Sequence, residues 1–190
     1  NSFAWNNTAA GATGAGAVTW GSGSAGVNGA VSAANSLVGT TTNDSVGYDN
    51  IVALGNGNYV VASRFWNNTA AATQAGAVTW GNGLGGTVGA VSSANSLVGT
   101  TSNDHVGSGG ITVLANNNYV VRSVDWDNGA VVNAGAVTWG SGTSGVSGNV
   151  TSVNSLVGTS NNDQVGSAGV SALTNGNYVV RSTGWDNAGT

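Results

Sequence analysis

The chain has 190 residues, of which only 5% are charged; it has no Lys, and its net charge is −4. Without a basic patch to hold phosphates, nucleic acid and anionic membrane surfaces are excluded as partners, and no apolar run approaches the roughly 20 residues that cross a bilayer. Because 40% of the residues are hydrophobic and seven are Trp, we expect a folded core rather than a disordered chain, and the absence of Cys excludes disulfides and thiol chemistry.

The sequence is an internal repeat with a period of about 60 residues. Asn-Tyr-Val-Val at residues 58–61 recurs at 118–121 and 177–180, and one Trp-to-Trp interval measures 46 residues in all three copies. The intervening Trp-to-Trp interval measures 15, 14 and 13 residues in successive copies, so it is predicted to contain a surface loop.

The repeat divides the chain into two full units and two partial units, which together form a single array. Residues 1–47 are predicted to form a partial unit with the third and fourth strands, 48–107 and 108–166 two full units, and 167–190 a partial unit with the first and second strands. The two partial units are complementary, so we expect an excerpt of a longer repetitive chain, or a processed product whose half-units complete each other between molecules.

Four short strands are predicted in the middle unit, between clusters of Gly, Asn, Ser and Thr. The first two strands, 51–54 and 59–61, flank a tight turn at 55–57 whose glycines allow positive φ. The third strand is 77–80, and the fourth runs from 90 to 99. No segment has the apolar spacing of a helix, so the predicted fold class is all-β, with tandem four-stranded antiparallel units.

Apolar or small residues on both faces of these strands indicate sheets that are covered on both sides. Blades of the β-propeller type fit this pattern best, and a β-prism or trefoil and a β-solenoid are the alternatives. Three blades are too few for an ordinary closed propeller, so pairing between molecules or a longer parent chain is expected.

The repeated unit reads Val-x-Ala-Leu-x-Asn-Gly-Asn-Tyr-Val-Val-x-Ser-x-x-Trp-x-Asn, followed by Ala-Gly-Ala-Val-Thr-Trp-Gly and Asn-Ser-Leu-Val-Gly. It resembles the repeats of very large haemagglutinin-like and adhesin-like bacterial surface proteins. It is also loosely similar to integrin-type FG-GAP blades, whose calcium loop is rich in Asp. The equivalent turns 56–58, 116–118 and 175–177 have no carboxylate, so neither a metal nor a cofactor is expected.

A Trp followed by Asn or Asp closes the second strand of each unit and leads into the variable loop. A flat apolar face beside an amide or carboxylate is what a sugar site requires. Packing of the indole between neighbouring sheets predicts the same recurrence, so both interpretations remain open. The candidate ligand-binding residues are Trp66, Asn67, Trp126, Asp127, Trp185 and Asp186.

Asp44, Asp104 and Asp163 share one phase of the repeat, which predicts either a carboxylate that faces a ligand or an Asx turn that bonds its own backbone. His105 is the only His, and its equivalents are Ser and Gln, so we expect a surface substitution. Paired acids across one cleft and a general base for a nucleophile are both missing, so we expect no catalytic residue and no enzyme activity.

The expected function is a non-enzymatic structural or adhesive repeat module that is extracellular or at the cell surface. It would be part of a long bacterial surface protein or of a filament joined by complementary half-units, with self-association as a homo-oligomer or filament. The alternative is a multivalent, lectin-like module that binds cell-surface glycans.

Overall fold

The computed structural model describes residues 2–186. They form short strands and one 3-10 turn, η1 (Thr8–Ala10), with no α-helix; no described helix is therefore long and apolar enough to cross a membrane. The strands are β1 (Ala17–Thr19), β2 (Ser36–Val38), β3 (Ile51–Ala53), β4 (Tyr59–Ser63), β5 (Ala77–Gly81), β6 (Gly89–Ala90), β7 (Ser96–Val98), β8 (Gly110–Val113), β9 (Tyr119–Ser123), β10 (Ala136–Gly140), β11 (Gly148–Asn149), β12 (Ser155–Val157), β13 (Val170–Ala172) and β14 (Tyr178–Val180).

Each full unit is an antiparallel meander of four strands. The second unit has the order β3-β4-β5-β7 and the third unit β8-β9-β10-β12. The first unit contributes the third and fourth strands, β1 and β2, and the last unit the first and second strands, β13 and β14. The prediction of an all-β chain with tandem four-stranded antiparallel units is confirmed.

The single fourth strand predicted over residues 90–99 is wrong, because two separate strands occupy this region. β6 leaves its own unit and pairs in parallel with β2 of the preceding unit, while β7 completes the meander. β11 pairs with β7 in the same way. Gly89 and Gly148 have φ of 93° and 91°, a conformation open to glycine that lets the chain change direction here.

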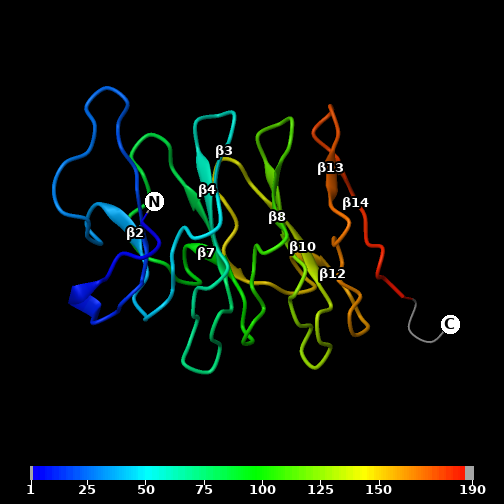
Figure 1. Cartoon of the computed structure of the whole chain (residues 1–190). Coiled ribbons are helices and arrows are strands. Elements are labelled where there is room, and N and C mark those ends of the chain that lie inside the picture. Colours follow the sequence, from blue (N-terminus) through cyan, green and yellow to red (C-terminus); the bar gives the residue numbers. More distant parts are fainter. Residues whose placement is uncertain (1, 187–190) are drawn as a thin grey trace.

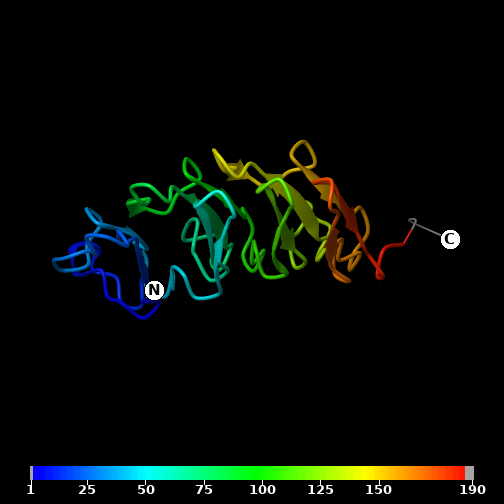
Figure 2. The same ribbon diagram turned by 90° about the horizontal axis from the view of Figure 1, so that it is seen from above.

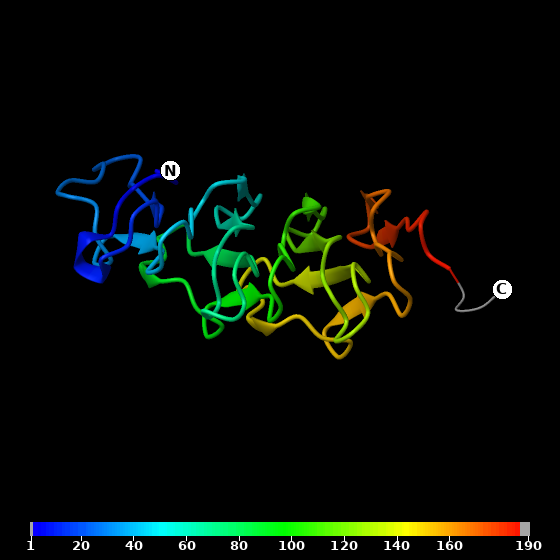
Figure 3. The same cartoon turned by 60° about the horizontal axis from the view of Figure 1, so that its bottom comes forward.

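The sheets stand side by side in an open row, from β1 and β2 at one end to β13 and β14 at the other (Figures 1 and 2). A third view shows the same succession, and the described residues do not close into a ring (Figure 3). Each full sheet is thus an antiparallel meander, and the sheets are arranged in a line.

The hydrophobic core lies between neighbouring units. One cluster joins Leu37 and Val46 of the first unit to Val61 and Trp66 of the second. The next cluster joins the corresponding side chains of the second and third units. Since burial of apolar surface is the main source of stability, a unit depends on its neighbour for its core, as in other repeat arrays.

Polar contacts also run from one unit to the next. The carbonyl oxygen of Gly142 in the third unit accepts hydrogen bonds from Asn56 Nδ2 (2.8 Å), Asn58 Nδ2 (2.9 Å) and Trp80 Nε1 (3.1 Å) of the second. The Asn residues of the predicted hairpin turn therefore bind the neighbouring unit.

Candidate functional site

The predicted Trp sites differ sharply in exposure. Trp66 and Trp126 are only 4% exposed and belong to the clusters between units. Neither indole offers a face on which a sugar could stack, so their burial does not support the predicted ligand-binding role and agrees with packing between sheets. Trp185, in the last unit, is 53% exposed.

The residue after each Trp is tied to the preceding unit by a buried carboxylate. The backbone N–H groups of Asn67, Asp127 and Asp186 donate to Oδ1 of Asp44 (3.1 Å), Asp104 (3.0 Å) and Asp163 (3.0 Å), respectively. The other oxygen closes a turn: Asp104 Oδ2, for example, accepts from the N–H groups of Thr100 and Thr101, both at 2.8 Å. We call each such carboxylate, with its three backbone donors, an Asp staple.

The Asp staple resolves the two interpretations of these aspartates. The expected Asx-type turn is present, and the same carboxylate also joins two units, a role that the sequence did not indicate. All three are shielded from water. Desolvation by burial is the largest effect on Asp44 and Asp104, and it raises the pKa of both carboxyl groups. For Asp163, in the last unit, the largest effect is the hydrogen bond from the Asp186 backbone N–H, which lowers its pKa.

A row of aromatic rings crosses the first two units. Successive ring centroids of Phe3, Tyr48, Phe65 and His105 are 5.4, 4.8 and 6.0 Å apart, all in edge-to-face geometry. This aromatic row contains both Phe residues and the only His of the chain. The other copies have no aromatic residue at the equivalent positions, so side chains that depart from the repeat gather in one place.

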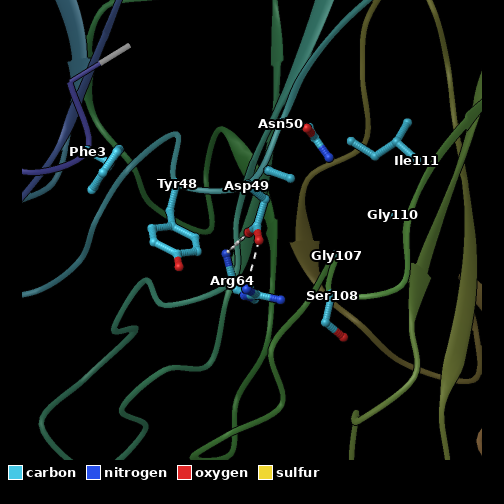
Figure 4. Close-up of a pocket in the computed structure, with 10 residues that line it drawn as sticks. Phe3, Tyr48, Asp49, Asn50, Arg64, Gly107, Ser108, Gly110 and Ile111 are labelled. Atoms are coloured by element: carbon cyan, nitrogen blue, oxygen red, sulfur yellow. Dashed lines mark hydrogen bonds and ion pairs between the residues drawn. The ribbon is translucent and has the colours of Figure 1, made fainter.

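The guanidinium group of Arg64 lies against the aromatic row, and Figure 4 shows it beside Tyr48 and Asp49. The guanidinium carbon of Arg64 is 5.4 Å from the Tyr48 ring centroid and 4.9 Å from that of Phe65. Asp49 orients it: Asp49 Oδ1 is 3.1 Å from Arg64 Nε, and Asp49 Oδ2 accepts the Arg64 backbone N–H at 2.9 Å.

An open cleft of about 480 Å³ borders these side chains. Its lining residues come from the first three units and include Phe3, Tyr48, Asp49, Asn50, Arg64 and Ile111 (Figure 4). Tyr48 is 40% exposed and Phe3 46%. The cleft thus offers an aromatic surface beside carboxylate, amide and guanidinium groups, the combination that was predicted at the Trp positions.

Further polar contacts lie beside this cleft. Asp125 Oδ2 accepts from Ser108 Oγ (3.0 Å) and lies 3.6 Å from His105 Nδ1. Arg122 Nη1 donates to the carbonyl oxygen of Gly166 (3.1 Å). His105 is a half-buried member of the aromatic row rather than an isolated surface substitution.

The described residues contain no group of three or more His, Cys, Asp or Glu that could hold a metal ion. The signal that could have located the cleft is the departure of Phe3, Tyr48, Arg64, Phe65 and His105 from the repeat. These residues are far apart in the sequence, and they come together only when the units lie side by side in the folded chain.

Comparison with known proteins gives one match. A family model described as a repeat of unknown function (DUF5650) matches residues 1–48, 53–108, 113–167 and 172–190. No curated protein and no solved structure matches the chain.

Proposed function

Because the chain belongs to the DUF5650 family of repeats of unknown function, we propose its role from geometry: it is a non-enzymatic structural and adhesive module of a long extracellular or cell-surface protein or filament. The resemblance of its unit to haemagglutinin-like and adhesin-like repeats supports this location. The small number of charges suits it, since contacts between uncharged polar surfaces depend little on salt.

The observation that carries the proposal is the addition of a strand from each full unit to the sheet of the preceding unit. Gly89 lies opposite Leu37, and Gly148 lies opposite Leu97, in parallel pairs. The shared core and the Asp staples act at the same junctions. A junction that recurs in this way can extend an array by whole units, as a fibre or stalk requires.

Electron microscopy and sedimentation across a concentration series test this role. We expect end-to-end particles whose length increases with concentration, because the parallel strand pairs and the shared core that join units within the chain can join units of separate copies in the same way. A compact, strictly monomeric particle at high concentration would contradict the filament role.

A second candidate function, glycan binding, is favoured by the cleft beside Tyr48 and Arg64. Aromatic faces bind the C–H side of a sugar, and Asp49, Asn50 and Arg64 supply acceptors and donors for hydroxyl groups. The candidate site thereby moves from the buried Trp66 and Trp126 to a cleft lined by side chains that depart from the repeat.

A glycan array tests the second candidate. Tyr48→Ala should abolish binding while the chain remains folded, and Trp139→Ala should not, because Trp139 is a 45% exposed aromatic outside the cleft. Equal loss in both variants, or no binding by the wild type, would exclude a glycan site at this cleft.

A further inference from the structure

A small pocket lies at the junction between the second and third units, the two full units of the chain. It has a volume of about 260 Å³. Its lining combines one indole with hydroxyl, amide and small apolar groups, which include those of Trp80, Thr87, Asn95, Ser144, Val146 and Ser147. No residue of this lining is charged, whereas charged side chains line the cleft beside Tyr48. The junction pocket is therefore a separate site with different chemistry.

The junction holds the Trp80 indole in one orientation. Trp80 packs against the core between these units but is only partly buried, and its Nε1–H donates to the carbonyl oxygen of Gly142 at 3.1 Å. Gly145, with φ of 75°, lies so close that a Cβ added there would be 2.6 Å from the Trp80 Cβ. Trp20 makes the same hydrogen bond at the first junction, to Gly83 (3.1 Å). A ring that is fixed in this way offers a preformed apolar surface to a ligand.

Hydroxyl groups of the pocket are open to a ligand. Ser144 and Ser147 are exposed, and neither side-chain oxygen has a hydrogen-bond partner among the described residues. Thr87 Oγ1 accepts the Asn82 N–H (3.3 Å) and donates to the carbonyl oxygen of Trp80 (3.4 Å), so one of its lone pairs remains free. All three hydroxyl groups can therefore accept a hydrogen bond from a ligand, and those of the two serines can also donate one.

The amide of Asn95 serves the fold rather than a ligand. Its Oδ1 accepts from the Ser92 N–H (2.9 Å) and the Ser96 hydroxyl (2.8 Å), and its Nδ2 donates to the carbonyl oxygen of Ala90 (2.9 Å). These bonds hold the turn that contains Ala94, which also lines the pocket. The groups left for recognition are the indole and the three hydroxyls.

We propose that the junction pocket binds a single neutral sugar ring, with the apolar face of the ring on Trp80 and its hydroxyl groups on the three side-chain oxygens. An indole face binds the C–H side of a sugar, and protein hydroxyls exchange hydrogen bonds with its O–H groups. The volume lies below the usual range for drug-sized ligands, so the pocket fits one ring rather than a chain. Since no charged group lines it, a sugar that carries a carboxylate would lose water without gaining a partner.

The three hydroxyl groups are particular to the second junction. The equivalent residues at the first junction are Val27, Gly85 and Val88. The Trp contact is retained there, so the residues that recognise a ligand vary on a constant frame. We therefore expect one such sugar site in the described residues, rather than one for each unit.

NMR titration with free monosaccharides tests the site. One ring with few hydrogen bonds should bind in the millimolar range, too weakly to be retained on a washed glycan array, so the array still reports on the cleft beside Tyr48. The probes are the methyl glycosides of glucose, galactose and mannose, with methyl glucuronide as the charged counterpart of the glucoside. Backbone amide signals of residues 144–147 should shift with a neutral glycoside, and the glucuronide should bind at least about 10-fold more weakly than the glucoside.

Ala94→Phe fills the pocket without changing the core. Ala94 is exposed, and the third unit has the larger, 95% exposed Val153 at the equivalent position. The dissociation constant of the glycoside should rise at least about 10-fold in this variant. Ala34→Phe is the matched control, because the same substitution at the equivalent position of the first unit should leave binding unchanged.

Thr87→Val tests the hydrogen bonding separately, because Val is the residue that both other units have at this position. Loss of one hydrogen bond should weaken binding by about 2- to 10-fold. Circular dichroism checks that all variants are folded. Equal loss in Ala94→Phe and Ala34→Phe, unchanged binding in Ala94→Phe, a preference for the glucuronide, or no shift with any neutral glycoside overturns the proposal. Tyr48→Ala should leave this binding intact, and its loss there would place the sugar in the cleft instead.

Discussion

At the scale of single residues, the buried carboxylate of Asp104 bonds to two units at once. Asp104→Asn leaves one acceptor oxygen for three N–H groups, so at least one buried donor loses its partner. We expect the free energy of unfolding to fall by about 1–3 kcal/mol in urea titrations. Asp127→Asn is the control: it keeps the backbone donor to Asp104, and Asn is the native residue at the equivalent position 67. Equal losses in the two variants would argue against the Asp staple.

The Asp staples also predict opposite pH dependences for Asp104 and Asp163. A folded-state pKa above the unfolded value stabilises most in acid, and this contribution is lost as the pH rises; a lowered pKa does the reverse. As the pH rises above about 4, the stability difference between wild type and Asp104→Asn should therefore shrink; as the pH rises towards about 4 from below, the stability difference between wild type and Asp163→Asn should grow. Urea titrations at several pH values measure both, and slopes of the same sign would contradict the two pKa shifts.

The sequence predicted the turn made by each aspartate, because an Asx turn is a local pattern. It did not predict the partner in the next unit, which is 23 residues away for Asp44 and Asn67. The same limit applies to the aromatic row. Each ring looks like an isolated exception to the repeat until the stacked units bring residues 3, 48, 65 and 105 together.

At the scale of secondary-structure elements, glycines set how closely the third strand approaches the loop after the fourth. A Cβ on Gly135 would collide with the backbone of Val165, whereas one on Gly129 would meet nothing, and both residues have positive φ. Gly129→Ala should therefore cost about 1–2 kcal/mol from backbone strain alone. Gly135→Ala should cost about 1–3 kcal/mol more from the collision. Thermal unfolding compares the two, and equal effects would contradict the close approach.

The hairpin of β3 and β4 was predictable because turn glycines and Asn lie between two apolar runs. The departure of β6 was not predictable, because a two-residue strand carries no periodicity. Its partner, β2, also lies in another unit. The segment was therefore read as the start of the fourth strand, which in fact begins at Ser96.

At the scale of the whole molecule, the core between units predicts uneven protection from hydrogen exchange. β4, β5, β9 and β10 lie in full sheets with neighbours on both sides, whereas β13 and β14 form a two-stranded sheet at one end. Amides of β13 and β14 should exchange faster than those of the central strands, because terminal units open locally. Uniform protection at low protein concentration would contradict a linear array in which stability comes from the neighbours.

The division into repeated four-stranded units was predictable because the sequence itself repeats. The choice between a ring and a row was not, since it depends on the rotation from each unit to the next. Contacts between units, such as those of Gly142 with Asn56 and Trp80, involve residues that look like ordinary turn or core positions in the sequence.

The strands β6 and β11, which each pair with the sheet of the preceding unit, have a mechanical consequence. When such an array is stretched, a unit should extend only after this strand separates from the preceding sheet, so the units should unfold one at a time. A unit of about 60 residues would lengthen by roughly 200 Å when fully extended. Force–extension curves from single-molecule stretching should therefore show a sawtooth of evenly spaced ruptures, so that the array dissipates an applied force by unfolding one unit after another.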